Sequence, residues 1–318
     1  MKVYTNIEGS NDLTEAKSTF QGHNFAISHI KQSPFVESSQ YVATSSLDGT
    51  VNVWDSAGSN WNLINTFRHA SAVFAMEWID KDSIASCGNE ETQIQIWKIN
   101  TKEVLNNKIN ASQPVTSLKL LSNQIHLAVG LVSGEIEIYA ISDGSQVGLT
   151  LQGHSSDIND FVQLDANTLI SSSRDHSMII WDLTTHTGSF NLTGHNDQVY
   201  GLKQVTSSVL ASASSDRNIK LWNTTTGNEI RNLSNHTGSI TWSVDLLNPQ
   251  ILISGSWDNS IKLWDWTTGE CLRTIETDLL FIYSLTVFTS TSSSLISTTA
   301  AFTTEAASTE ATTAKQPG

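Results

Sequence analysis

Residues 194–223 read GHNDQVYGLKQVTSSVLASASSDRNIKLWN, and closely similar stretches recur along the chain. Each repeat ends in an aromatic residue, and the gaps between successive ends are 43, 42, 42, 41 and 42 residues. The aromatic residues are Trp54, Trp97, Tyr139, Trp181, Trp222 and Trp264. A period of about 40–45 residues predicts a radial array of four-stranded sheets, in which each unit buries its apolar face against its neighbours.

Four repeats share a second regularity. An Asp lies six residues before the Trp, and a His lies 27 to 31 residues before it. Apolar residues alternate between Asp and Trp, as Ile219 and Leu221 do before Trp222, which predicts a half-buried strand. The Asp opens the turn before this strand, where its side chain can accept hydrogen bonds from nearby backbone amides.

The recurring Gly-His, Asp and Trp-Asp pattern resembles the WD-repeat (beta-transducin-like) family over residues 16–288. The resemblance implies an all-β fold, a seven-bladed β-propeller with four-stranded antiparallel blades. It also implies a buried tetrad of Trp, Ser or Thr, His and Asp in each regular blade. The four sets would be His23, Thr44, Asp48 and Trp54; His154, Ser171, Asp175 and Trp181; His195, Ser212, Asp216 and Trp222; and His236, Ser254, Asp258 and Trp264.

Two repeats depart from this pattern. The second has Glu90 and Glu91 where the Asp turn is expected, with one extra residue, and the third has Tyr139 in the Trp position and no His. We expect these two blades to be held by packing alone and to open more easily than the others.

The two ends of the chain are expected to close the ring. The segment SSSLISTT (292–299) resembles SSVLASAS (207–214), and Lys2-Val3-Tyr4 resembles Lys220-Leu221-Trp222. We therefore expect each terminus to supply two strands of a last, seventh blade, which removes exposed sheet edges. Six blades with frayed ends are the alternative. The propeller is assigned to residues 1–299, and the Thr/Ser/Ala-rich stretch 300–318 is expected to be a disordered tail.

Composition excludes several classes of function. The formal net charge of -14 disfavours nucleic acid and anionic membrane surfaces, and no apolar run or secretory leader is seen. We expect no cofactor, no metal site and no catalytic residue. Ser171, His154 and Asp175 are the residue types of a hydrolytic triad, but the same set recurs in four repeats, each with its own Trp, which favours an architectural role.

A partner would then bind the surface around the central channel. In WD-repeat proteins the narrow face of the disc is a common docking site, with residues at the start of the innermost strand and just before the tetrad Asp. Here these positions include the hypothetical partner-binding residues Phe74, Arg174, Tyr200, Trp242, Trp257 and Tyr283. Aromatic residues and Arg dominate binding hot spots, so Tyr200, Trp242 and Tyr283 on consecutive blades, with Trp257 nearby, mark the strongest candidate.

The sequence thus predicts a non-catalytic scaffold that docks peptides or proteins on the narrow face. It is expected to be a monomer within a larger assembly, intracellular, with the cytoplasm favoured and the nucleus as the alternative. The other function considered is a propeller enzyme or small-molecule-binding protein that uses the channel. That function requires ionisable residues converging on one channel mouth, whereas the sequence predicts charges scattered over the turns.

Overall fold

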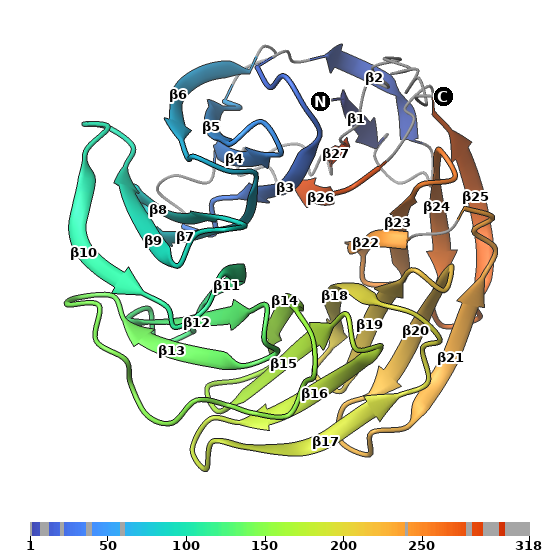
Figure 1. The fold of residues 1–318 in the computed structure, drawn as a ribbon. Helices are drawn as coiled ribbons and strands as arrows, with labels where there is room; N and C mark the ends of the chain where they lie inside the picture. The colour runs from blue at the N-terminus through green and yellow to red at the C-terminus, as the bar shows by residue number, and fades with distance from the viewer. Residues whose placement is uncertain are drawn as a thin grey trace, which may run out of the picture.

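The computed structural model describes residues 2–6, 13–19, 22–35, 40–57, 61–238, 241–277, 282–288 and 299–302. For residues 2–6, 13–19, 106–108, 241, 288 and 299–302 it describes the backbone alone. The regular elements in these ranges are β-strands, arranged as blades around a central axis (Figure 1). The all-β propeller with antiparallel blades is therefore confirmed. No helix in the same ranges is long and apolar enough to cross a membrane.

Six sheets follow one another along the chain, each beginning at its innermost strand. Blades 1 and 2 are β3 (Ile27–Gln32), β4 (Tyr41–Ser46), β5 (Thr50–Asp55) and β6 (Asn62–Arg68), then β7 (Val73–Asp80), β8 (Ser83–Gly88), β9 (Gln93–Lys98) and β10 (Val104–Asn110). Blades 3 and 4 are β11 (Val115–Leu120), β12 (His126–Leu131) and β13 (Ile136–Ala140), then β14 (Ile158–Gln163), β15 (Thr168–Ser173), β16 (Ser177–Asp182) and β17 (Thr187–Thr193). Blades 5 and 6 are β18 (Val199–Thr206), β19 (Val209–Ser214), β20 (Asn218–Asn223) and β21 (Glu229–Ser234), then β22 (Thr241–Asn248), β23 (Ile251–Ser256), β24 (Ser260–Asp265) and β25 (Glu270–Glu276).

Blade 3 differs from the other five because its sheet has three strands. The outer position is taken by a segment that pairs with β13 through isolated bridges, at Ile136 with Leu151 and at Tyr139 with Gln146, and through a hydrogen bond from the Val147 amide to the Ile138 carbonyl. Leu149 lies between these bridges and is 71% exposed. The repeat with the weakest sequence pattern therefore also has the least regular outer edge.

A further sheet joins the two ends of the chain. Its strand order is β2 (Leu13–Thr19), β1 (Lys2–Asn6), β27 (Thr299–Phe302) and β26 (Leu285–Phe288), so each terminus supplies two strands. We call it the closing sheet; with the six blades of the alternative arrangement it makes seven sheets in the described chain. Strand β27 extends into the first residues of the expected tail, and most of 292–299 and all of 303–318 lie outside the described residues.

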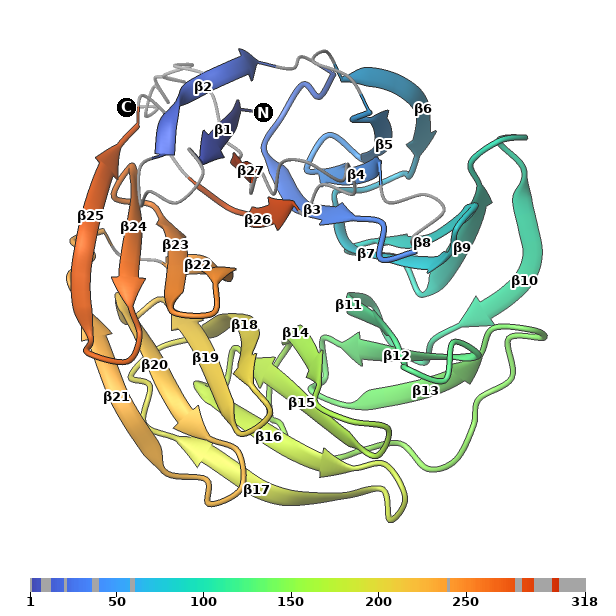
Figure 2. The ribbon, with the colours of Figure 1, turned by 180° about the vertical axis from the view of Figure 1, so that it is seen from behind.

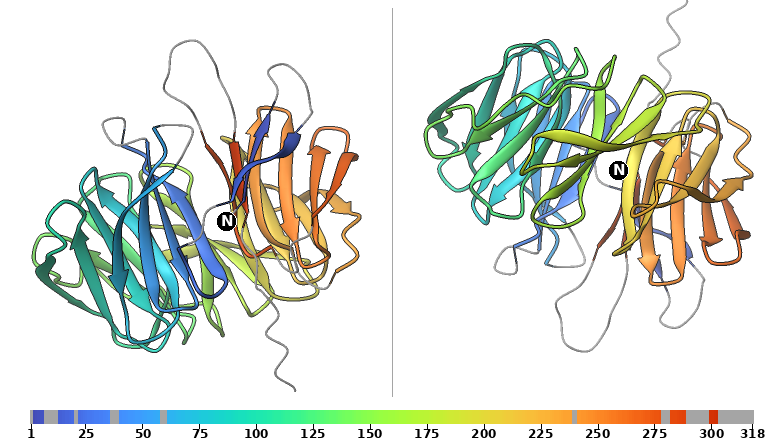
Figure 3. Two further views of the ribbon diagram at one scale, coloured as in Figure 1. Left: turned by 90° about the horizontal axis from the view of Figure 1, so that it is seen from above. Right: turned by 90° about the horizontal axis from the view of Figure 1, so that it is seen from below.

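The innermost strands form a complete ring around the axis. β26 contacts both β22 and β3, and β3, β7, β11, β14, β18 and β22 contact one another in that order (Figure 2). A hydrogen bond from the Ile30 amide to Ser284 Oγ, 3.2 Å long, joins blade 1 to the segment that leads into β26. Seen from the side, the strands run across the thickness of a disc (Figure 3).

The apolar cores lie between adjacent blades rather than inside one of them. Val51 and Phe67 of blade 1 pack against Trp78 of blade 2, and similar clusters fill each following gap as far as the one between blade 6 and β26. Since each blade is covered on both faces, its second strand is buried along nearly its whole length. This explains why these strands are runs of Ser, Ala and Gly flanked by Ile, Leu and Val.

Candidate functional site

Blades 4, 5 and 6 contain the expected tetrads in nearly identical geometry. The indole N–H of Trp222 donates to Ser212 Oγ over 2.8 Å, Ser212 Oγ lies 2.7 Å from His195 Nε2, and His195 Nδ1 lies 2.8 Å from Asp216 Oδ2. The corresponding distances in blades 4 and 6 are between 2.8 and 2.9 Å. Each chain of bonds runs from the middle of the blade to the turn that carries the Asp.

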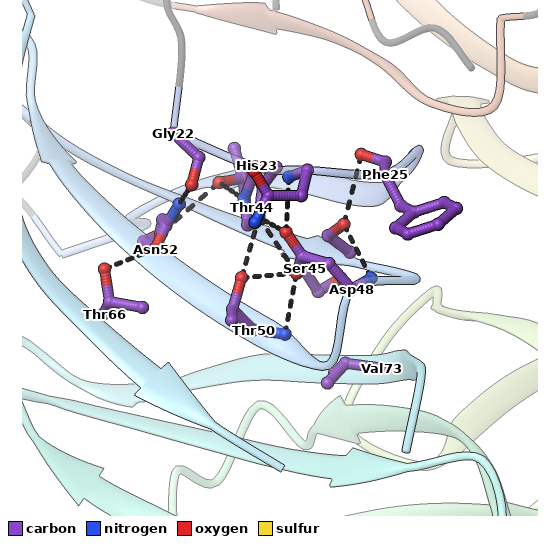
Figure 4. A network of polar contacts seen from close by, with 12 residues as sticks. Gly22, His23, Phe25, Thr44, Ser45, Asp48, Thr50, Asn52, Thr66 and Val73 are labelled. Atoms are coloured by element: carbon purple, nitrogen blue, oxygen red, sulfur yellow. Dashed lines mark hydrogen bonds and ion pairs between the residues drawn. The ribbon is translucent and has the colours of Figure 1, made fainter. Parts of the chain in front are cut away.

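Blade 1 has the same chain with a variation (Figure 4). Trp54 Nε1 and His23 Nε2 both bond Thr44 Oγ1, over 2.9 and 2.7 Å. His23 Nδ1 lies closer to Thr50 Oγ1, at 2.8 Å, than to the Asp48 carboxylate, at 3.3 Å. Thr50 in turn donates to Asp48 through its hydroxyl and its amide. The hydroxyl thus relays the contact that is direct in blades 4 to 6.

The tetrad carboxylates also fasten two loops together. Asp216 accepts hydrogen bonds from the amides of Asn196 and Asn218, so it joins the segment before the innermost strand to the turn between the second and third strands. Burial alone would raise the pKa of Asp216, but His195 and these amides outweigh it and lower the pKa to about 2. The pKa values of Asp175 and Asp258 are lowered by the same kind of contacts.

Blade 2 contains a fifth tetrad, contrary to the expectation that packing alone holds it. Trp97 Nε1 donates to Ser86 Oγ over 2.9 Å, His69 Nε2 lies 2.8 Å from the same oxygen, and His69 Nδ1 lies 2.9 Å from Glu91 Oε2. The longer Glu side chain compensates for the extra residue in the turn. A signal was present in the sequence, because His69 precedes Ser86 by 17 residues, as His154 precedes Ser171 and His195 precedes Ser212.

Blade 3 also has a buried polar network, so the expectation of packing alone is wrong there too. The Tyr139 hydroxyl lies 2.7 Å from Glu137 Oε2 and 3.0 Å from the Asn110 carbonyl oxygen. The amide of Ser112 donates to the same Glu137 oxygen over 3.2 Å. Glu137 is two residues before Tyr139 on one strand, so this network replaces the long-range tetrad with a short local one.

The tetrads are enclosed in the blades. Ser171 is fully buried, His154 is 7% exposed, and the Ser171 oxygen already bonds both His154 and Trp181. A nucleophile in a hydrolytic triad must be open to its substrate. The arrangement at Ser171, His154 and Asp175 therefore supports the architectural interpretation.

The residues expected at the channel mouth occupy a recurring structural position. In each of the six blades the register between the first two strands shifts by one residue, as between Val199 and Gly201 opposite Ser214 and Ala213. The residue left without a partner in the ladder is the mouth residue itself. The six are Ser28, Phe74, Thr116, Asn159, Tyr200 and Trp242. A bulge of this kind re-aims a side chain, here toward the mouth of the channel.

Four of the predicted partner-binding residues form one aromatic cluster. The ring centroids of Tyr200 and Trp242 are 3.8 Å apart, those of Trp242 and Trp257 5.8 Å, and those of Trp242 and Tyr283 5.3 Å. Trp257 and Tyr283 are 5.4 Å apart, with their planes at 69°. All four side chains are half-buried, and they come from blades 5 and 6 and the segment before β26. We call Tyr200, Trp242, Trp257 and Tyr283 the aromatic cluster.

One polar atom in the aromatic cluster is conspicuous. The indole N–H of Trp242 is buried and has no hydrogen-bond partner among the described residues. A buried donor without a partner raises the free energy of the folded protein by about 1–3 kcal/mol. By contrast, the Tyr200 hydroxyl has a partner, Gln198 Oε1, at 2.5 Å.

The other two predicted residues lie apart from the cluster. Phe74 lines the channel from blade 2, and no ring contact joins it to the aromatic cluster among the described residues. Arg174 is exposed in the turn of blade 4 and forms an ion pair with Asp157, with Nη1 and Oδ2 3.3 Å apart. Both residues line the same cavity as Tyr200, Trp242 and Tyr283, which has a volume of about 470 Å³.

The channel itself contains charged residues, whereas the sequence predicted that the charges would be scattered over the turns. Lys31, Lys119, Lys203 and Asp245 line the cavity, and each is three residues after a mouth residue on its strand. Glu77, at the same position of blade 2, lies 3.0 Å from Lys31 Nζ and 3.9 Å from Lys119 Nζ. The expectation of scattered charges is therefore wrong, although the signal was present in the constant three-residue offset.

These channel charges are largely paired across neighbouring blades. Lys203 Nζ lies 2.5 Å from Asp245 Oδ1, and the other Asp245 oxygen accepts the Val287 amide over 2.8 Å. Asp160 accepts the amides of Phe161 and Leu202, at 2.8 and 2.9 Å; burial raises its pKa despite the nearby lysines. We call Lys31, Glu77, Lys119, Lys203 and Asp245 the belt. Its ion pairs tie the innermost strands together.

Comparison with known proteins gives a matching family model and a similar solved structure. The family model described as "WD domain, G-beta repeat" matches residues 14–55, 145–182, 186–223 and 227–265, the repeats of blades 1, 4, 5 and 6. The WD40 β-propeller domain of Doa1 has a TM-score of 0.72 at 19% identity, covering 91% of this chain and 95% of that one. This likeness shows a shared fold.

Three curated relatives match part of the chain. Protein SPA1-RELATED 3 of Arabidopsis thaliana is 26% identical over 47% of this chain and 18% of its own length. Pre-rRNA-processing protein crb3/ipi3 of Schizosaccharomyces pombe is 28% identical over 55% and 37%, and the Ribosome biogenesis protein WDR12 homolog of Drosophila persimilis is 23% identical over 46% and 40%. The match thus spans less than half the length of each relative.

Proposed function

This chain belongs to the WD-repeat family, and we propose that it is a non-catalytic scaffold that docks a peptide or protein at the channel mouth. The observation that carries the proposal is the aromatic cluster, four half-buried rings in contact on consecutive blades. Large aromatic side chains with restricted rotamers supply much of the binding energy at interfaces while losing little entropy. Phe74 and Arg174 extend the proposed surface along the rim of the same cavity.

The buried indole N–H of Trp242 supports docking of a chain segment rather than a purely apolar group. A backbone carbonyl of a bound peptide would satisfy this donor once the rings around it move apart on binding, because the nitrogen is closed off from solvent in the free protein. The rest of the rim offers polar groups for further contacts, since Asn159 and Thr116 are also mouth residues. An interface with an aromatic centre and a polar rim is typical of protein–protein recognition.

The relatives bear on the setting of this scaffold. Two of them are named for ribosome biogenesis and pre-rRNA processing, and we propose on this basis that the chain works in a nuclear assembly. The cytoplasm, favoured from sequence, gains no support from these names.

A small-molecule-binding role for the channel is the second candidate. It is favoured by one observation, the cavity of about 470 Å³ lined by Lys31, Lys119, Lys203 and Asp160. The pairing of Lys203 with Asp245 and of Lys31 with Glu77 favours a structural role for most of these charges, so we rank this candidate below docking.

The docking proposal is tested by the double variant Trp242→Ala, Trp257→Ala. We expect it to lose the partners that the wild-type chain captures from cell extract, as identified by mass spectrometry. The matched control is Trp266→Ala, which removes an indole from the turn between β24 and β25 of the same blade, and should capture normally. Circular dichroism checks that both variants keep the fold. Undiminished capture by the folded double variant would refute the site.

A further inference from the structure

The face that carries the aromatic cluster is strongly acidic. We define the mouth face by the segments before the innermost strands and the turns between the second and third strands of the blades. Its described residues include nine carboxylates and two guanidiniums, those of Arg174 and Arg217. Five of the carboxylates are the tetrad acids, and the other four are Glu90, Glu135, Asp157 and Asp197. The described turns on the opposite face carry four carboxylates and two lysines, and further carboxylates cap these turns from the strand ends, namely Asp55, Asp80, Asp182 and Asp265.

Two of these carboxylates lie beside the aromatic cluster. Asp157 lines the cavity together with Tyr200 and Trp242, and Asp197 is three residues before Tyr200 in the segment that leads into β18. Aromatic faces next to carboxylates form a favourable environment for a cation, because the ring quadrupole and the negative charges attract it together. The guanidinium of Arg174 already pairs with one of these carboxylates, 3.3 Å from Asp157, with its side chain 48% exposed.

The channel limits how deep a cation could enter. Lys31, Lys119 and Lys203 are three residues further along the innermost strands, about 10 Å below the mouth at the rise of a β-strand. Their ammonium groups already pair with Glu77 and Asp245, so the carboxylates at that depth are neutralised and offer little attraction to a further cation. A cationic side chain is therefore favoured at the level of the aromatic cluster and disfavoured in the belt below it.

We propose that the docked partner segment is basic, with at least one arginine or lysine placed over the aromatic cluster beside Asp157 and Asp197. This inference rests on the proposed docking function and adds the chemical class of the partner. An acidic segment would meet the repulsion of the whole mouth face, whose described residues offer it two cations, Arg174 and Arg217. Long-range attraction to the same face would also raise the association rate at low salt.

Two single substitutions should change the affinity for a basic segment in opposite directions. Arg174→Gln removes the cation that competes for Asp157, so it should tighten binding of a basic segment by about two- to fivefold. Asp157→Asn should weaken the same binding by a similar factor. Both side chains lie in surface loops, so the fold should be unaffected. A matched control is Asp165→Asn, in a turn of the opposite face of the same blade, which should leave the affinity unchanged.

The probe is a display library of random twelve-residue peptides, selected on the full 318-residue chain and counter-selected on the folded Trp242→Ala, Trp257→Ala variant. We expect the selected peptides to be enriched in arginine and lysine. A selected peptide should bind several-fold more weakly when its arginines are replaced by citrulline, and more weakly as salt is raised. Its affinity should follow the signs given above for Arg174→Gln and Asp157→Asn.

The outcomes separate this inference from the docking proposal. Selected peptides that are neutral or acidic, or that bind equally well with citrulline, would overturn the basic partner while leaving the docking site in place. A selected basic peptide whose affinity ignores both Arg174→Gln and Asp157→Asn would also overturn it. A library that yields no peptide specific for the wild-type chain over the double variant would overturn both proposals.

Discussion

Replacing Glu91 with alanine should destabilise the protein far more than replacing its neighbour Glu90. The Glu91 carboxylate lies 2.9 Å from His69 Nδ1 and accepts the amides of Ala70 and Gly88 over 3.1 and 3.3 Å. His69 has a fully buried side chain, so its Nδ1 would be left without a partner. That loss raises the free energy of the native state by about 1–3 kcal/mol, and the two amides add about 0.5 kcal/mol each. We therefore expect a loss of about 3 kcal/mol.

Urea denaturation followed by circular dichroism measures the difference, with a shift in the midpoint of roughly 1 M for a chain of this size. Amide hydrogen exchange then locates it, since β8 and β9 should lose protection while β19 and β20 should keep theirs. Glu90→Ala is the control, because the Glu90 side chain is exposed and should change stability by less than about 0.5 kcal/mol. Equal stabilities for the two variants would show that the fifth tetrad contributes nothing and that packing alone holds blade 2.

Two further predictions concern other buried polar groups. Tyr139→Phe removes the hydroxyl shared by Glu137 and the Asn110 carbonyl, and since Glu137 is 4% exposed we expect a loss of about 1–3 kcal/mol in urea denaturation; no loss would mean that the local network of blade 3 is dispensable. The pKa of Asp216 is lowered from 3.8 to about 2 in the folded protein, so its contribution of roughly 2 kcal/mol is complete above pH 4 and is lost as the pH falls through 2. Asp216→Asn should therefore be less stable than wild type at pH 7, with the gap closing toward pH 2 in thermal unfolding, and a gap that stays constant with pH would contradict the reasoning.

The blade architecture was predictable because the same residue types recur at nearly the same positions of successive repeats. Asp216 keeps its spacing to Trp222 in three other repeats, His195 nearly keeps its own, and the resemblance to the WD-repeat family implied the hydrogen bonds among them without coordinates. Glu91 was missed because one inserted residue moved the carboxylate along the turn, and a longer side chain restored its position. A rule based on fixed spacing does not recognise such a compensation.

The channel was less predictable, for a different physical reason. The contact of Trp242 with Tyr283 joins residues on neighbouring blades, whereas a sequence repeat specifies the interior of one blade. That the rings would gather could be guessed from their register, but their contact and the unpartnered Trp242 indole follow from how the blades meet. The ion pairs of Glu77 with Lys31 and Lys119 likewise connect three blades and have no counterpart in any single repeat.

The bulge at the start of each innermost strand separates the choice of the mouth side chain from the pairing of the strands. Tyr200, Phe74 and Asn159 occupy it in different blades, although one is a phenol, one a hydrocarbon ring and one an amide. Since the bulged residue takes no part in strand pairing, its side chain can change without shifting the register of the strands that hold the ring together. Substitutions at these positions can therefore change the lining of the channel mouth one blade at a time while the strand pairing of the disc is preserved.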